Sequence, residues 1–477
     1  MHLPVLRFGQ PYESAEKLSV RDALTGEPLA SLSLANAALI RRDASRRVRD
    51  AHAALQRFTV DQLIACVQEA GRRLMTDALP CGEELLGIEA FCTLTSRATG
   101  LPETLVKANL GKLHHVCTRV DEVLNGLARG LDLSVLDTHL GQLNGVPMSW
   151  VQTAHSLAAL LPSNSPGVHS LWIPALALKT PVALKPGRSD PFVPYRLIQA
   201  MIAAGIPREA FAFYPTDHSG ADTLVESHDR ALVFGGPAVA ARYANNPAVE
   251  VHGPGYSKVL LGPDQAEQWP FHLETIATSV ALNGGRSCIN ASSVYTTAHA
   301  SELAHALAEH LAALAPKNLD HPDATLAAFS DPEAAHAIDA RIEQYLLQPG
   351  AIDLSAAHQP DRVLTHNGMT FLRPTVVLIT DPGHPLANTE FGFPFVAVVP
   401  CAAETMIERM GPTLVCAAIT EDPSLVTRLL KTATIDRLHL GPLPTTSIRW
   451  DQPHEGNLLE WLYRRRAIAI EPFGASA

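Results

Sequence analysis

The sequence predicts an α/β protein with two parallel sheets, formed one after the other along the chain. From residue 155 to about residue 255, short apolar runs alternate with segments of helical periodicity, and this order produces a parallel sheet covered by helices on both faces. A second alternating block extends from residue 272 to residue 433. The chain has 477 residues, 47% of them hydrophobic, and is therefore expected to form two or three domains.

Residues 34 to 130 predict a helical region ahead of the first sheet. They are rich in Ala, Leu and Arg, and apolar residues recur at steps of three and four in RRDASRRVRDAHAALQRF and DQLIACVQEAGRRLM. The residues before them, MHLPVLRFGQPYESAEK, lack the apolar segment of a secretory signal. We therefore expect no secretory signal at this end.

The first alternating block predicts five buried strands, each followed by a turn that contains Pro or Gly. We expect the strands near 157–162, 181–186, 211–215, 230–236 and 249–255, and helices near 174–179, 191–205, 219–227 and 237–246. Such a series is typical of a Rossmann-like, nucleotide-binding domain, in which ligands bind at the carboxyl ends of the strands.

The second block predicts strands near 292–297, 369–380, 395–400 and 414–420, with helices near 272–285, 299–314, 402–410 and 423–433. The end of the chain, HEGNLLEWLYRRRAIAIEP, predicts a helix followed by a strand, with little chain left to bury that strand. A terminal strand of this kind pairs with another subunit in many proteins, so we expect an oligomer.

Composition and charge exclude several classes of protein. The net charge of −11, with no basic stripe to offset it, argues against a nucleic-acid partner. The most apolar stretch, LWIPALALKTPVALKP, contains Pro174, Lys179 and Lys185, so a membrane span is not expected. The seven cysteines are scattered and never form CxxC, which predicts neither disulfides nor a zinc site and favours a cytoplasmic protein.

One cysteine, Cys288, lies in the loop ALNGGRSCINAS between two predicted elements. A structural thiol needs no such loop, and most cysteines are small core residues. A nucleophilic thiol, in contrast, must be reached by substrate and surrounded by backbone donors. The loop therefore predicts that Cys288 is a catalytic nucleophile.

Three further segments predict a site at the strand ends. PSNSP places Asn164 directly after a strand, VALKPGRSDP places Lys185 at another strand end, and LVFGGPAVAA places Gly235 and Gly236 between a strand and a helix. Exposed N–H groups at such a helix start can meet a phosphate or a cofactor edge. Taken singly, each has an ordinary structural interpretation, as a turn asparagine, a solvated lysine or a tight turn.

In this order, the segments resemble the motifs of the aldehyde dehydrogenase superfamily over nearly the whole chain. The resemblance implies a Rossmann-like cofactor domain, a second α/β catalytic domain and a small oligomerisation element, with NAD or NADP as cofactor. The matching residues are Asn283, Gly285 and Cys288 in N-x-G-x-x-C, Pro162, Asn164 and Pro166 in P-x-N-x-P, Lys185-Pro186 in K-P, Phe234 to Pro237 in F-T-G-S, Arg373 to Val376 in P-T-V, and Glu390 to Pro394 in E-x-F-G-P.

The resemblance also implies roles for these residues. Cys288 attacks the carbonyl carbon as a thiolate, and Asn164 with the Cys288 backbone N–H forms the oxyanion hole. Cofactor binding is assigned to Lys185, Pro186, Gly235, Gly236, Glu390 and Phe391. No residue is assigned to a metal.

The sequence departs from the family pattern where the hydrolytic members have E-L-G-G-K, whose Glu activates water. Here the segment reads VEVHGPGYSK, with Val251 or His252 near that position and Glu250 displaced. Since adjacent strand residues face opposite sides, Glu250 serves as the base only through a bulge, and His252 is an alternative base. At the position of the Glu in E-x-F-G-P, this chain has Thr389. Arg286, two residues before Cys288, is expected to lower the pKa of the Cys288 thiol.

The missing base favours the acylating branch, which includes CoA-dependent aldehyde dehydrogenases and the long-chain acyl-CoA reductases of bacterial luminescence. CoA is then a candidate co-substrate, and an aldehyde or acyl thioester the small-molecule substrate. The alternatives are a hydrolytic aldehyde dehydrogenase, a non-catalytic binding or scaffold relative, and a cysteine hydrolase, for which no relay is evident.

The predicted domains are residues 1–252, with the helical segment, the NAD(P)-binding domain and oligomerisation strands near 130–152; residues 253–445, with Cys288; and residues 446–477, with a terminal helix and oligomerisation strand. A homodimer or homotetramer is expected.

Overall fold

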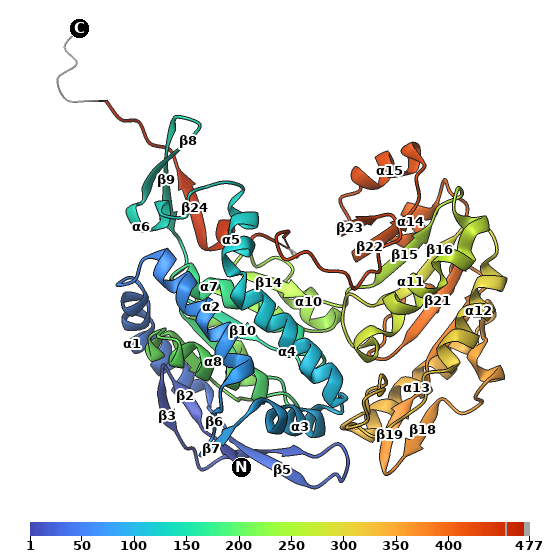
Figure 1. Ribbon diagram of the computed structural model, residues 1–477, viewed down its shortest axis with the longest axis horizontal. Coiled ribbons are helices and arrows are strands. Elements are labelled where there is room, and N and C mark those ends of the chain that lie inside the picture. Colours follow the sequence, from blue (N-terminus) through green and yellow to red (C-terminus); the bar gives the residue numbers. More distant parts are fainter. Residues whose placement is uncertain (454–455, 472–477) are drawn as a thin grey trace.

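The computed structural model describes residues 1–453 and 456–471 as two α/β lobes and a projecting strand extension (Figure 1). The amino-terminal lobe (blue to green) contains one seven-stranded sheet, and the carboxy-terminal lobe (yellow to red) contains a second. The last described segment returns to the amino-terminal lobe, where its strand pairs with a strand of the extension.

Five parallel strands form the centre of the first sheet, and two antiparallel strands extend one edge. The spatial order is β14-β13-β10-β11-β12-β2-β3. Its strands are β2 (Val5–Arg7), β3 (Gln10–Tyr12), β10 (Leu157–Leu160), β11 (Val182–Lys185), β12 (Phe211–Phe213), β13 (Arg230–Phe234) and β14 (Val249–His252).

Both faces of this sheet are buried, as expected for parallel strands that read as continuous apolar runs. Ala158, Ala183 and Ala212 pack beneath α1 and α9, while alternate residues such as Leu184 and Phe211 pack against α2, α7 and α8. The helices of this lobe are α1 (Ala37–Leu55), α2 (Val60–Thr76), α3 (Ile88–Thr99), α4 (Glu103–Thr118), α5 (Val120–Ala128), η1 (Pro166–Leu171), α7 (Ile173–Ala177), α8 (Phe192–Ala203), η2 (Arg208–Ala210), α9 (His218–Ser227) and α10 (Pro237–Tyr243).

The second sheet has the order β17-β20-β21-β16-β15-β22-β23, and all of its pairs except β17 with β20 are parallel. Alternate residues of each strand face opposite layers of helices. Val259 and Val294 contact α11 and α12, whereas Leu260 and Tyr295 belong to the core on the other face. The strands are β15 (Ser257–Leu261), β16 (Ala291–Thr296), β17 (Ala351–Asp353), β20 (Thr375–Ile379), β21 (Phe395–Pro400), β22 (Thr413–Ile419) and β23 (Ile435–Leu440).

The helices of the second lobe lie on both faces of its sheet. They are η3 (Ala266–Gln268), α11 (Trp269–Ala281), η4 (Leu282–Gly285), α12 (Ala300–Ala312), α13 (Pro332–Leu346), η5 (Ser355–Ala357), η6 (Pro385–Asn388), α14 (Met406–Met410) and α15 (Pro423–Leu430). Small sheets complete the two lobes: β1 (His2–Leu3) with β5 (Pro28–Ser33) and β4 (Lys17–Arg21), β6 (Leu79–Cys81) with β7 (Glu84–Leu86), and β18 (Val363–His366) with β19 (Met369–Leu372).

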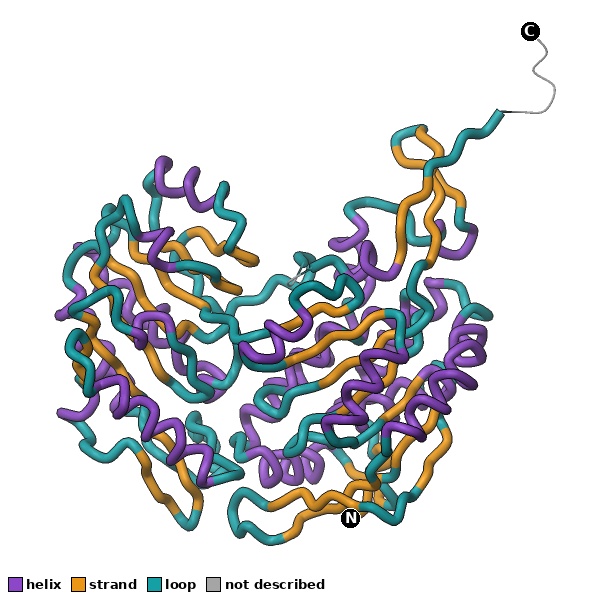
Figure 2. The backbone as a smooth tube through the Cα atoms, turned by 180° about the vertical axis from the view of Figure 1, so that it is seen from behind, coloured by secondary structure: helices purple, strands orange, loops and turns teal. Residues whose placement is uncertain are grey.

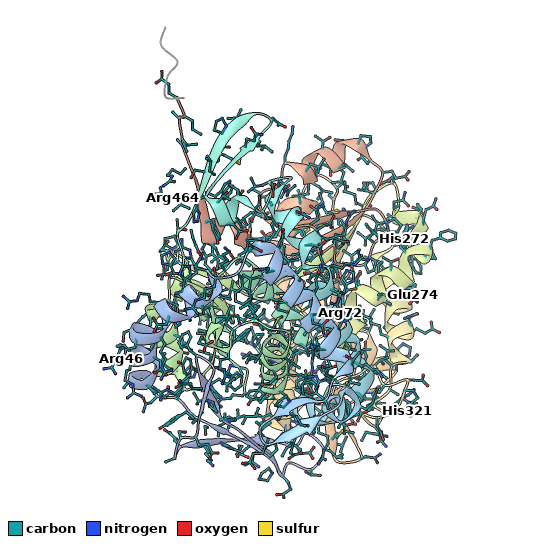
Figure 3. The ribbon with its side chains drawn as sticks, turned by 60° about the vertical axis from the view of Figure 1, so that its left-hand side comes forward. Arg46, Arg72, His272, Glu274, His321 and Arg464 are labelled. Atoms are coloured by element: carbon teal, nitrogen blue, oxygen red, sulfur yellow. The ribbon has the colours of Figure 1, made fainter. Side chains whose placement is uncertain are left out.

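The extension is a three-stranded antiparallel sheet that projects from the amino-terminal lobe, as Figure 2 shows from behind. It joins β8 (Leu140–Leu143) and β9 (Val146–Gln152), which follow α6 (Val135–Thr138), to β24 (Tyr463–Arg466), which follows α16 (Leu458–Leu462). Figure 3 labels Arg464 beside this sheet; it is exposed, as are the labelled Arg46 on α1 and Arg72 on α2. The prediction of a terminal helix followed by a strand is confirmed, although this strand pairs within its own chain.

Most predicted elements are confirmed, and the errors have local causes. The stretch 369–380, predicted as one strand, is broken between β19 and β20 at Arg373 and Pro374. Pro374 has no N–H for a ladder, and the Arg373 guanidinium binds the Asp353 carboxylate at 2.8 Å. The helix predicted near 402–410 begins only at Met406. The short strands before residue 34 and the β6–β7 hairpin were not predicted. No helix in the described part of the chain is long and apolar enough to cross a membrane.

Candidate active site

The loop that carries Cys288 follows α11 and has an unusual backbone. Asn283, Gly284 and Gly285 all adopt positive φ angles, of 58°, 65° and 68°. A Cβ on Gly285 would lie 2.3 Å from the Pro394 nitrogen, so both the conformation and the space require glycine there. These three residues turn the chain sharply from the end of α11 toward Cys288.

Buried amides hold this turn from both sides. Asn283 Nδ2 donates to the hydroxyls of Ser165 and Ser287 at 3.2 and 3.0 Å, and Asn283 Oδ1 accepts from Asn109 Nδ2 on α4 at 2.6 Å. Asn290 Oδ1 accepts from the Ser287 N–H at 2.8 Å. The loop is therefore tied to α4 and to the loop after β10 before any substrate arrives.

Cys288 lines a cavity between the two lobes together with Asn164. Phe234, at the end of β13, lies on the same wall, and Trp450 closes it from the returning chain. Asn164 Nδ2 donates to the Arg286 carbonyl oxygen at 2.8 Å. The structure thus brings together Cys288 and Asn164, which the sequence predicts as nucleophile and oxyanion donor.

The Arg286 side chain makes contacts other than the one predicted for it. Its guanidinium donates to the Thr99 carbonyl oxygen at 2.7 Å and to the Ala328 carbonyl oxygen, and it lies over the Phe329 ring. Burial lowers the pKa of Arg286 to about 10. The expectation that this cation activates the thiol is wrong, because its hydrogen bonds join the nucleophile loop to the end of α3 and to the chain near Ala328.

Glu250 and His252 lie on one face of β14, since they are two residues apart. His252 Nε2 lies 3.2 Å from Glu250 Oε1, and the His252 ring stacks on Phe234 with centroids 4.7 Å apart. Glu250 lines a neighbouring cavity with Arg437 and Trp450, next to the cavity of Cys288. The two candidate bases therefore contact each other, and Trp450 and Phe234 link them to the wall around the sulfur.

The residues predicted to hold the cofactor lie at the carboxyl edge of the first sheet. Lys185 ends β11, with Pro186 buried behind it, and its pKa is lowered by burial and by the nearby Arg188. Gly236 caps α10, and nothing lies within 4 Å of the position of a Cβ there. Lys185 and Arg188 follow β11, and the open start of α10 follows β13, with β10 between the two strands. Cations and an open helix start along one edge suit an anionic cofactor such as a dinucleotide.

Glu390 and Phe391 lie near the nucleophile loop rather than at that edge. Glu390 Oε2 accepts from the Tyr256 N–H at 2.6 Å, and Phe391 packs edge-on against Phe395 at 4.8 Å between centroids. Burial raises the pKa of Glu390 to about 7, although the Tyr256 and Gly255 N–H groups and Lys258 oppose this shift. In this structure the Glu390 carboxylate braces the segment between β14 and β15.

That segment contacts Cys288 directly. A Cβ on Gly255 would lie 1.9 Å from the Cys288 carbonyl oxygen, and Ser257 Oγ donates to the same oxygen at 2.8 Å. Lys258 Nζ donates to the Tyr256 carbonyl oxygen at 2.7 Å, and burial lowers its pKa to about 8. Within the described residues, no three His, Cys, Asp or Glu side chains form a candidate metal site.

Sequence comparison decides the family. A model of the aldehyde dehydrogenase family matches residues 11–413. The chain belongs to this family. Aldehyde dehydrogenases are oxidoreductases that act on aldehydes with NAD(P), and the α/β fold predicted from the motifs is confirmed. Comparison with curated protein sequences yields no match.

Solved aldehyde dehydrogenases share the fold over the whole chain at low identity. The aldehyde dehydrogenase KauB from Pseudomonas aeruginosa aligns with a TM-score of 0.80 and 18% identity, covering 98% of this chain and 96% of its own. A salicylaldehyde dehydrogenase from Pseudomonas putida G7, complexed with salicylaldehyde, gives 0.80 and 11%, with 100% and 99% covered. The NADP-dependent glyceraldehyde-3-phosphate dehydrogenase from Bacillus halodurans C-125, complexed with NADP, gives 0.76 and 18%, with 98% of each chain covered.

Several residues of this aldehyde dehydrogenase site were missed by sequence reasoning. Asn109, Lys112 and Asn290 belong to predicted helical or loop segments with no motif of their own. A polar residue on the apolar face of α4, between Val106 and Leu110, is the signal that points to Asn109. Nothing comparable in the sequence points to Lys112 or Asn290.

Proposed function

We propose that the protein interconverts an aldehyde and an acyl thioester, with Cys288 as the nucleophile, NAD(P) as the redox cofactor and a thiol such as CoA as the acyl acceptor. The observation that carries the acyl acceptor is that Glu250 lines a cavity beside that of the sulfur, while neither Glu250 nor His252 is among the described residues that line the Cys288 cavity. A base engaged there is poorly placed to deprotonate a water at Cys288.

The chemistry follows from the cavity residues. The Cys288 thiolate forms an S–C bond to the aldehyde carbon, and the carbonyl electron pair moves to the oxygen. Asn164 Nδ2 turns from the Arg286 carbonyl to this oxyanion, which the Cys288 backbone N–H also stabilises. After oxidation the acyl group is a thioester on Cys288. The thiolate of CoA then attacks that carbon, and the Cys288 thiolate leaves.

The cofactor is assigned to the edge formed by Lys185, Pro186, Gly235 and Gly236, and its nicotinamide end to the neighbourhood of Glu390 and Phe391. When bound there, NAD(P)+ would supply the hydride acceptor. This assignment is supported by the open space before α10 and by the two neighbouring cations Lys185 and Arg188.

Lys185→Ala should weaken NAD(P) binding about tenfold, measured by calorimetry, because it removes a half-buried cation from the proposed cofactor edge. Iodoacetamide labelling of Cys288 should not change. Arg208→Ala, on η2 away from that edge, is the matched control. Unchanged cofactor affinity in Lys185→Ala would place the nucleotide elsewhere.

Hydrolysis is the second candidate, and the 3.2 Å contact between His252 and Glu250 is the observation that favours it. A histidine held by a carboxylate is a competent general base. A rotation of either side chain toward Cys288 would then let the pair activate water.

A transient-state assay separates the two candidates. With aldehyde and NAD(P)+ alone, the acylating enzyme should show a burst of about one reduced cofactor per active site and then a slow phase. Free CoA should accelerate the slow phase, and acyl-CoA with NAD(P)H should give aldehyde. Rapid steady turnover without CoA that is lost in both Glu250→Gln and His252→Ala would establish hydrolysis instead.

We also propose a homodimer or homotetramer joined through the extension, in the cytoplasm. The extension exposes Leu140, Val146 and Ile470, at 46%, 55% and 56% of their surfaces, and apolar side chains on a projecting sheet favour burial against another copy. Light scattering should give a mass of two or four chains, and Val146→Asp should lower it. A monomeric wild-type protein would contradict this proposal.

A further inference from the structure

The cavity at Cys288 has apolar walls and one cationic group. Val168, Leu171 and Phe234 supply much of the wall, and Lys112 on α4 lies at its boundary. Of the described residues that line this cavity, Lys112 is the only charged one. A substrate that fits it therefore combines an apolar middle with an anionic end.

The helix that carries Lys112 is fixed relative to the loop that carries Cys288. Lys112 lies three residues after Asn109 and so shares that face of α4. Asn109 bonds to Asn283 of the loop, and α4 packs against η1, which forms another wall of the cavity. The backbone of α4 and the Cys288 loop thus form one packed unit, and the ammonium and the thiol both line the cavity between them.

The ammonium is half-buried and has no carboxylate partner among residues 1–453 and 456–471. Burial lowers the pKa of Lys112, and no acidic group opposes this shift. A partly desolvated cation with no counter-charge costs stability, and a bound anion would offset that cost. The contrast is Lys107 on the same helix, which is exposed and pairs with Glu89 at 2.7 Å.

The approach to this cavity also carries positive charge. A larger cavity of about 660 Å³ shares Ile448 and Trp450 with it and is lined by Arg119, Arg129 and Arg449. Arg119 pairs with Glu122 at 2.5 Å and Arg449 with an aspartate at 2.8 Å, while Arg129 has no ion pair within the described chain. An anionic substrate would gain from this net positive potential on entry.

From these contacts we infer that the substrate is an aldehyde with a carboxylate at its far end, an ω-oxo acid, and that Lys112 binds that carboxylate. This inference rests on the proposed role of Cys288 and names the substrate class of the same site. A carboxylate, with a single negative charge, matches the single ammonium better than a phosphate dianion does.

The first test compares aldehydes of equal length. The wild-type enzyme should have a kcat/KM for 4-oxobutanoate at least tenfold above that for butanal. Lys112→Met, which keeps the apolar stem, should lower the value for 4-oxobutanoate by 10- to 100-fold and leave that for butanal within about threefold. Lys112→Arg should restore part of the preference, and Lys107→Met should change neither value. Equal loss for both aldehydes in Lys112→Met would overturn the inference, because the residue would then be structural.

A second readout needs neither cofactor nor acyl acceptor. Iodoacetate, an anion, and iodoacetamide, its neutral analogue, should both alkylate Cys288. Lys112→Met should slow labelling by iodoacetate about tenfold and leave labelling by iodoacetamide unchanged. If iodoacetamide does not label Cys288 at all, the proposed function fails. If it does label Cys288, but Lys112→Met leaves the iodoacetate rate unchanged, only the inference about Lys112 fails.

The remaining outcomes concern other anions at the same ammonium. If Lys112→Met raises only the KM for CoA, the residue binds the phosphates of the acyl acceptor. If an ω-oxo phosphate is a better substrate than the ω-oxo acid and depends equally on Lys112, the ligand is a phosphate. Either result would overturn the carboxylate assignment.

Discussion

The nucleophile loop and the segment from β14 to β15 meet at the Cys288 carbonyl, yet they differ in how closely they follow the family pattern. In the loop, the N-x-G-x-x-C residues are present, and buried amides fix their backbone. In the opposite segment, His252, Tyr256 and Lys258 occupy a stretch that departs from the pattern, and Glu390 braces it. Under the proposed function, the residues that form the acyl-enzyme follow the family pattern, while those that would release it depart from it.

The difference has a physical basis. The loop must place one sulfur and its donors within tenths of an ångström, and small changes in its backbone would cost a large part of the rate. Release can use different acceptors, so the residues opposite the sulfur are free to vary. A site can therefore keep its first chemical step and change its second without a change in fold.

The largest effect should come from Cys288→Ala, which removes the nucleophile of the preserved loop. Turnover should fall below detection, and the fold, by circular dichroism, and cofactor affinity should remain. Iodoacetamide should label Cys288 first, because burial raises the pKa of other thiols, to about 12 for Cys117 and Cys416. Cys66→Ala is the control and should be fully active. An active Cys288→Ala enzyme would remove the basis for the whole comparison.

A smaller effect is expected from Asn164→Ala. Loss of an oxyanion donor should lower kcat about a hundredfold, which corresponds to roughly 3 kcal/mol. The burst phase and the slow phase should both slow, because attack on the aldehyde and later attack on the thioester each place an oxyanion beside Asn164. A change confined to the Michaelis constant would instead make Asn164 a binding contact.

The smallest effect should come from Glu390→Gln in the opposite segment, measured as the stability of the protein without cofactor. Burial raises the pKa of Glu390 to about 7, above the value of about 4.3 for an exposed glutamate, so the folded protein holds this proton more tightly. The resulting stabilisation is complete below pH 4 and declines as the pH rises through 7. Burial is the main cause of this shift, and the Tyr256 and Gly255 N–H groups and Lys258 reduce it.

In Glu390→Gln this pH dependence should disappear. The free energy of unfolding, measured with urea, should fall in the wild type relative to the variant by about 1–3 kcal/mol between pH 5 and pH 8. Glu408→Gln, on the surface of α14, should show no such change. A difference that stays constant over this range would mean that Glu390 keeps an ordinary pKa and that its neighbours compensate its burial.

The sequence predicted the framework well because its signals are local. Apolar runs with Pro or Gly turns located β10 to β14, and Cys288, Asn164 and Lys185 stood out at strand ends and in a distinctive loop. At the interruption between β19 and β20, Pro374 is a local signal, whereas the ion pair of Arg373 with Asp353, 20 positions earlier, could not be predicted from the sequence.

The partners of the site residues could not be predicted in the same way. Asn109 contacts Asn283 across 174 positions, and Glu390 reaches Tyr256 across 134. Arg286 was misassigned because nearness in sequence to Cys288 says nothing about where a long side chain points. Pair contacts of this kind arise only when α4, η6 and β15 have packed together.

The return of the chain to the first lobe has a consequence for biosynthesis. Trp450 and Ile448 close the wall around Cys288, Asn457 Nδ2 bonds to the Leu127 carbonyl at 3.0 Å, and β24 completes the extension. During translation the parallel strands of the first lobe, the last of which ends at His252, are made about 200 residues before this segment. The sheet of the first lobe is therefore synthesised well before Ile448 and Trp450, which complete the wall around Cys288.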